Sequence, residues 1–139
     1  MNLEKMIITA LIIIAACICF LYPLYNRSNK SVAEAEPDYH MLAKHLANDF
    51  HTDKTQADKK YLHKVIQVTG HLKEITHNNE SMVILLKGSS PFENISCTLE
   101  QDITFPLKTL TAGRLMIIRG ECTGFLMDVT MVHCRIINQ

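Results

Sequence analysis

The stretch KVIQVTGHLKEI, residues 64–75, decides the fold class because its apolar residues recur at every second position. Four alternate residues share one face of an extended chain: Ile66, Val68, Gly70 and Leu72. The residues between them, from Gln67 to Lys73, are polar. This period of two predicts a strand that is buried on one side. Turn residues at 76–79 and an apolar run at 82–86 then complete a predicted hairpin.

Three more strands are predicted downstream of this hairpin. Residues 88–91, reading GSSP, break the chain before an alternating third strand at 95–99. Apolar alternation over 115–122 and 129–137 predicts the last two strands, after an irregular or helical connection that contains Pro106. Five strands with the longest interruption after the third fit a mainly β, five-stranded Greek-key barrel of the OB type. A five-stranded open meander fits the same spacing.

A helical pattern precedes the strands. Apolar residues recur at the spacing of one helix face: Tyr39, Leu42, Ala43, Leu46, Ala47 and Phe50. This spacing predicts an amphipathic helix that packs against the core of the domain. Asp53 is positioned to cap a second short helical turn that runs through residues 57–62.

The N-terminal segment carries the strongest hydrophobic signal. Residues 6–25 read MIITALIIIAACICFLYPLY and contain no charged residue. About 20 helical residues span the roughly 30 Å hydrocarbon layer of a bilayer, so the run predicts a transmembrane helix. We therefore expect a membrane anchor over residues 1–25, a solvated linker over 26–37, and an OB-fold domain with its N-terminal helix over 38–139.

Two forms of this anchor are compatible with the sequence. The tetrapeptide from Ile14 to Cys17 matches a bacterial lipobox, in which the cysteine is lipidated after the preceding segment is removed. The apolar run continues beyond Cys17, which favours an uncleaved anchor over a lipoprotein. Lys5 precedes the anchor and Arg27 and Lys30 follow it, so charge alone weakly predicts a domain that faces inward.

Composition argues against several classes of function. Fourteen lysines and arginines balance fourteen aspartates and glutamates, whereas a surface that binds a polyanion is more often basic. The seven histidines stand singly, without the close spacing typical of a metal site, and we expect no metal or cofactor. No serine, cysteine or lysine lies in a recognisable nucleophile motif. The sequence therefore predicts a protein that is not an enzyme.

Three tracts carry a resemblance to a known family: ADKKYLHKVIQVTGHLKEI at 57–75, ISCTL at 95–99 and GECTGFLMDVTMVHC at 120–134. They resemble the bacterial tRNA_anti-like OB-fold family of small membrane-attached or lipidated proteins, and the resemblance covers nearly everything after Pro37. It implies an OB barrel on the periplasmic side of a membrane, held by a single-pass anchor or by a lipid on Cys17. The resemblance alone implies neither a nucleic-acid ligand nor catalysis.

Cysteines on the predicted strands should point into this barrel. Cys97, Cys122 and Cys134 each share the apolar face of a strand. They are either buried free thiols or, because an exported domain meets an oxidising compartment, include a disulfide between Cys122 and Cys134.

The function that follows is a noncatalytic, membrane-anchored OB-fold module that binds a protein or small ligand. The alternative is binding of single-stranded nucleic acid or oligosaccharide on the face that other OB-folds use. Base stacking needs aromatic rings on that face, yet Phe92, Phe105 and Phe125 fall at predicted loops or strand ends, so nucleic acid is not the expected partner. The candidate ligand face comprises His71, Lys73, Phe125 and Asp128.

Overall fold

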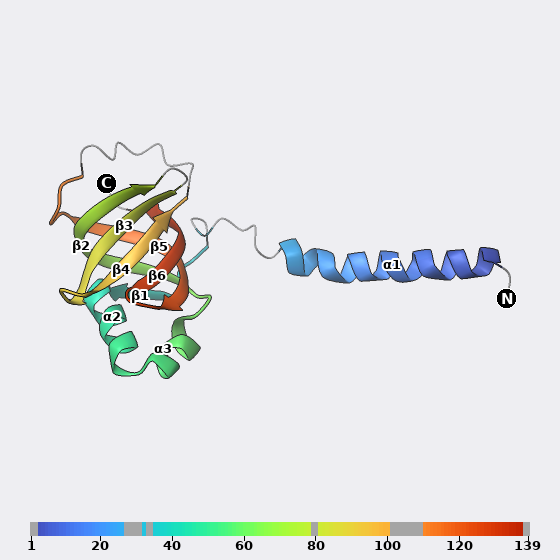
Figure 1. Cartoon of the computed structure of the whole chain (residues 1–139), viewed down its shortest axis with the longest axis horizontal. Helices are drawn as coiled ribbons and strands as arrows, with labels where there is room; N and C mark the ends of the chain where they lie inside the picture. Colours follow the sequence, from blue (N-terminus) through green and yellow to red (C-terminus); the bar gives the residue numbers. More distant parts are fainter. Residues whose placement is uncertain (1–2, 27–31, 33–34, 79–80, 101–109, 138–139) are drawn as a thin grey trace. The chain divides into compact units, whose positions relative to one another are not determined.

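The computed structural model of the chain describes residues 3–26, 32, 35–78, 81–100 and 110–137 (Figure 1). The chain divides into two compact units, Met1–Lys30 and Ser31–Gln139. In the first unit the described element is one helix, α1 (Leu3–Asn26). The second unit holds the strands, the other helices and the hydrophobic core.

Helix α1 includes the apolar run for which a membrane anchor was predicted. The described side chains of this helix, over residues 7–20, are exposed, and Cys17 has a free, exposed thiol. Within the part of the chain that the structure describes, no helix is both long and apolar enough to cross a membrane.

A closed barrel forms the centre of the second unit (Figure 1). Its elements are β1 (Tyr39–Leu42), α2 (Ala43–Thr52), α3 (Lys54–Tyr61), β2 (Val65–Asn78), β3 (Ser81–Ser90), β4 (Glu93–Leu99), β5 (Leu115–Phe125) and β6 (Val129–Ile136). The strand order is β1-β2-β3-β4-β6-β5, and β5 pairs back onto β2. Strands β4 and β6 are parallel, while the other barrel pairs are antiparallel. This connectivity confirms the five-stranded OB-type barrel and excludes the open meander, whose first and last strands do not close on each other.

Strand β2 closes the barrel because it is long enough to pair on both sides. Its first half, from Val65 to His71, pairs with β5, and its second half pairs with β3. The predicted apolar face is confirmed, since Ile66, Val68 and Leu72 are buried. At Gly70, an added β-carbon would lie 2.7 Å from the β-carbon of Ala43, so the missing side chain lets α2 approach the barrel.

Helix α2 covers one end of the barrel with an apolar face. Ala43, Leu46, Ala47 and Phe50 are all buried, as the helical spacing predicted. They join the largest side chains from the barrel interior in one core, which includes Ile66, Leu72, Ile84, Leu86, Ile95, Met116, Ile118 and Met131.

The helix predicted from Tyr39 begins four residues later, so the prediction for its first turn is wrong. Residues 39–42 instead form β1, which pairs in parallel with residues 66–69 of β2. Tyr39 packs edge-on against the ring of Tyr61, with 5.2 Å between centroids, and Leu42 is exposed. The local spacing of apolar residues cannot reveal this pairing, because the partner strand lies far along the chain.

Other boundaries agree with the sequence or move by a few residues. Asp53 caps α3 as predicted, accepting a hydrogen bond of 3.0 Å from the backbone of Gln56. Strand β3 continues through the predicted break to Ser90, because Ser90 pairs with Glu93 and shifts the turn beyond it. The predicted connection around Pro106 lies outside the described residues.

Candidate binding face

The outer surface of β3 and β4 is the first candidate site, because OB barrels bind ligands on the corresponding two strands and on the adjoining turns. Four partly exposed residues form this surface, which we name the β3–β4 face: Val83, Leu85, Ser96 and Thr98. They pair across the ladder, Val83 with Thr98 and Leu85 with Ser96, and alternate with buried residues such as Ile84 and Cys97. These four positions present two aliphatic side chains and two hydroxyls without an aromatic ring, and the exposed Lys87 continues the row on β3.

A polar cluster borders this face where β4 begins. The Nζ of Lys73 donates to the carbonyl of Pro91 at 2.9 Å and to Oδ1 of Asn94 at 3.2 Å. The backbone and side-chain nitrogens of Asn94 both donate to Oδ1 of Asp128, at 2.9 and 3.1 Å. Asn94 is only 5% exposed, so these bonds satisfy a buried amide. The cluster fixes the β3–β4 turn to the start of β6.

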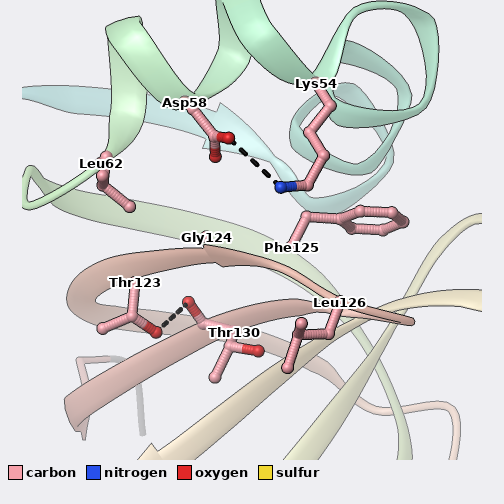
Figure 2. A pocket seen from close by; sticks show the side chains of 8 residues that line it. All are labelled: Lys54, Asp58, Leu62, Thr123, Gly124, Phe125, Leu126 and Thr130. Carbon is pink, nitrogen blue, oxygen red and sulfur yellow. Dashed lines mark hydrogen bonds and ion pairs between the residues drawn. The ribbon is translucent and has the colours of Figure 1, made fainter.

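An open pocket of about 340 Å³ lies between α3 and the β5–β6 hairpin (Figure 2). Lys54 and Asp58 form an ion pair of 3.3 Å on the helix side. On the hairpin side, the hydroxyl of Thr123 donates to the carbonyl of Thr130 at 3.1 Å. The ring of Phe125 also lines the pocket. The pocket thus combines an ion pair, two hydroxyl groups and an aromatic ring.

The hydrophobic core holds Phe125 in position. Its ring stacks on that of Phe50, with 5.9 Å between centroids and 19° between planes. Phe50 is buried and also contacts Tyr61 at 6.0 Å. Gly124, with φ of 120°, lies at a register shift in β5 where the strand bends toward this position. One face of the Phe125 ring is therefore occupied by Phe50, and only the remainder can contact a ligand.

The structure brings together only part of the predicted ligand face. Lys73 and Asp128 both contact Asn94, and Phe125 lies on the same hairpin as Asp128. His71 lies elsewhere: its Nδ1 is 3.0 Å from the carbonyl of Gly113, beside the start of β5. Two of the four predicted residues thus share one cluster, a third lines the neighbouring pocket, and His71 belongs to neither.

The family model for tRNA_anti-like proteins matches residues 1–136. This chain belongs to the tRNA_anti-like family. The fold of this chain is similar to that of a lipoprotein from Klebsiella pneumoniae subsp. pneumoniae to which nucleic-acid binding has been ascribed. Its crystal structure aligns with a TM-score of 0.57 and 13% identity, over 80% of this chain and 98% of that one.

A more distant match to this tRNA_anti-like chain is the Stn1–Ten1 complex of S. pombe. It has a TM-score of 0.42 and 14% identity, over 54% of this chain and 59% of that one. A search of curated proteins found no significant match.

Three buried thiols lie inside the tRNA_anti-like barrel, as predicted. Cys97, Cys122 and Cys134 are free, and the Cys122–Cys134 disulfide is not formed. The register explains this, because Cys122 pairs with Met131 while Cys134 pairs with Leu99 of β4. Burial raises the pKa of Cys122 to about 11 and raises the pKa of Cys134 well above 9.0. Both thiols are therefore protonated and unreactive at neutral pH.

Two features of the site were not predicted from the sequence. Asn94 and Lys54 carry no periodic or motif signal, and only the packing of β4 against β6 and of α3 against the hairpin gives them a role. Leu126 and Met127 did carry a signal, since two consecutive apolar residues in a predicted turn are unusual. Both are more than four-fifths exposed.

Proposed function

We propose that this chain is a noncatalytic interaction module that binds a protein partner on its β3–β4 face while attached to a membrane. The observation that carries the proposal is the chemistry of that face. Its members, Val83, Leu85, Ser96 and Thr98, provide apolar contact and hydrogen-bonding hydroxyls but no ring, and the exposed Lys87 is the next residue of the same row on β3. Such a surface resembles the mixed apolar and polar composition of ordinary protein–protein interfaces.

The absence of catalysis is part of this proposal. A nucleophilic cysteine needs a depressed pKa and access to its substrate, whereas burial raises the pKa of Cys122 and Cys134. The polar cluster is also closed on itself, because Lys73 and Asp128 are both held by Asn94. These contacts support a structural role for the cluster at the border of the face.

Membrane attachment is proposed through the uncharged run at 6–25, as an uncleaved anchor with the domain outside the cytoplasm. We expect the full chain to remain with bacterial membranes after an alkaline carbonate wash, with an intact mass that includes Met1. Protease added to spheroplasts should digest the domain. A chain that begins at Cys17 and carries a diacylglycerol would establish the lipoprotein form instead, and full protection from protease would reverse the orientation.

A second candidate function is binding of single-stranded nucleic acid or oligosaccharide. The observation that favours it is the pocket, where Lys54 and the ring of Phe125 are neighbours. A cation beside a ring is the combination on which such ligands bind. The family name and the description of the Klebsiella lipoprotein point to the same class. Against it, Asp58 neutralises Lys54, and Phe50 covers part of the ring.

The two candidates differ in their affinity for an oligonucleotide. We expect the detergent-solubilised chain to bind a fluorescent oligothymidylate only weakly, with no change in fluorescence anisotropy at physiological salt. Acidic residues equal the lysines and arginines in number, and Asp58 neutralises Lys54 at the pocket, so little counterion release can drive binding. Micromolar or tighter binding at that salt, abolished by Phe125→Ala but kept by Phe92→Ala, would promote the second candidate. A labelled oligosaccharide provides the parallel measurement for a neutral ligand.

A further inference from the structure

Three large apolar side chains project from one end of the barrel. Phe92 is 87% exposed, Leu126 88% and Met127 83%, the highest values among the apolar residues described in the globular unit. Phe92 lies in the β3–β4 turn, and Leu126 and Met127 lie in the β5–β6 turn. We name these three residues the apolar tip. Large apolar side chains gathered at one end of a domain are typical of a surface that contacts a protein or a membrane.

The two turns that carry the apolar tip are held side by side. Strands β4 and β6 run parallel with Ile95 opposite Val129, so the residues that precede both strands lie at the same end of the barrel. Asn94 donates twice to Asp128 across the gap between these turns. The backbone N–H of Leu126 donates to the carbonyl of Asp128 at 3.2 Å and tightens the second turn. The tip is therefore a fixed feature of the barrel end.

The carboxylates beside the apolar tip are all engaged within the protein. Asp128 accepts from Asn94, Glu93 pairs with His51 and accepts from Ser89, and Asp58 pairs with Lys54. Among the cations, Lys73 donates to the carbonyl of Pro91, next to Phe92. Lys87, opposite Asn94 in the ladder, is exposed. Of these carboxylates, Asp58 has a cationic partner, and the two lysines that contact or face Asn94 offset part of the negative charge of Asp128 and Glu93 toward the anionic headgroups of a bacterial membrane.

The proposed anchor would keep the domain close to a lipid surface. The linker at 26–37 has twelve residues, and a chain of that length reaches at most about 40 Å. A bilayer within that reach is present at a high effective concentration. A protein partner would need a complementary pocket for side chains that project from a turn. A fluid bilayer accepts them without one.

We propose that the apolar tip inserts into the interfacial region of the membrane to which the chain is attached, and so orients the β3–β4 face relative to that surface. This inference rests on the membrane attachment proposed above. Phe, Leu and Met are suited to this position, because side chains of this kind enter the boundary between headgroups and acyl chains.

The test uses tryptophan as a probe, since the natural chain contains none. The full chain with Met127→Trp is reconstituted into vesicles of phosphatidylcholine and phosphatidylglycerol, with or without bromine on the acyl chains. We expect a blue-shifted emission that brominated lipid quenches by more than half. The matched control is Leu115→Trp, a half-exposed position at the opposite end of β5, roughly 30 Å away along the strand. This control should show water-like emission and little quenching.

A second set of variants tests whether the three residues act together. Phe92→Trp should be quenched like Met127→Trp, and adding Leu126→Gln and Met127→Gln should remove most of that quenching. All three positions are exposed, so these variants should keep the far-UV circular dichroism of the natural chain. If the chain floats with the vesicles but Met127→Trp and Leu115→Trp are quenched equally and weakly, the membrane attachment stands and the insertion is wrong. A blue-shifted emission of Met127→Trp without quenching by brominated lipid would also overturn the insertion, because a protein or a second copy of the chain would then cover the tip. A chain that does not float would overturn both proposals.

Discussion

Replacing Phe50 by alanine should lower the free energy of unfolding by about 3–5 kcal/mol, the range for removing a buried aromatic ring. Phe50 is 1% exposed, and its ring contacts both Tyr61 and Phe125. The substitution would leave a cavity between α2 and the barrel and remove the support for the Phe125 ring. Chemical denaturation of the detergent-solubilised chain, followed by the near-UV circular dichroism of its tyrosines, measures the change.

Phe92→Ala is the matched control for this prediction. It removes the same side chain from a position that is 87% exposed and should change the free energy of unfolding by less than about 0.5 kcal/mol. Equal losses for the two variants would contradict the packing of α2 onto the barrel. The Phe50→Ala substitution should also alter the neighbouring pocket, because Phe125, which lines it, loses the ring on which it stacks.

Raising the pH above 9 should destabilise the fold through the buried thiols. The pKa of Cys122 is raised from 9.0 to about 11, chiefly by burial, and that of Cys134 is raised in the same direction. The folded state then holds a proton that the unfolded state releases, so stability is fully present below pH 9 and falls as the pH rises through 11. For Cys122 alone, a rise in pKa from 9.0 to about 11 corresponds to a loss of about 2–3 kcal/mol of folding free energy at high pH.

Denaturation curves between pH 7 and pH 11 in the presence of a reducing agent measure this dependence. Cys122→Ala should lose stability at neutral pH because of its cavity, yet show a shallower decline with pH than the natural chain. The pKa of Tyr61 is also raised by burial, so part of the decline will persist in the variant. Parallel curves for the two proteins would show that Cys122 does not titrate between these values. Rapid alkylation of Cys122 at neutral pH would contradict its burial.

Much of the barrel could be predicted because its signals are local. A strand with one buried face needs apolar residues at every second position, and β2 carries them over Ile66, Val68 and Leu72. The same rule found β4, β5 and β6, and placed the three cysteines inside. The four buried residues of α2 and the cap at Asp53 follow from helical spacing and from the chemistry of helix ends.

The candidate site was harder to predict because its members come from separate elements. Lys73 and Asp128 were named from the sequence, but their common contact, Asn94, has no pattern that marks it. His71 shares the polar face of the predicted strand with Lys73. A long strand that changes partners places such neighbours in different surroundings, and His71 contacts Gly113.

The sequence by itself determined where most of the strands and helices form and which face of each is buried, since a period of two or 3.6 residues directs apolar groups to one face whatever the partner. Only the tertiary structure decided which strands pair. The parallel contact of β1 with β2 turned the predicted first helical turn into a strand, and the register of β5 and β6 placed Met131 opposite Cys122. The parallel pairing of β4 with β6 placed the turn that carries Phe92 and the turn that carries Leu126 and Met127 at the same end of the barrel. These contacts join residues far apart in the chain, and local periodicity reports only on residues that are close in sequence.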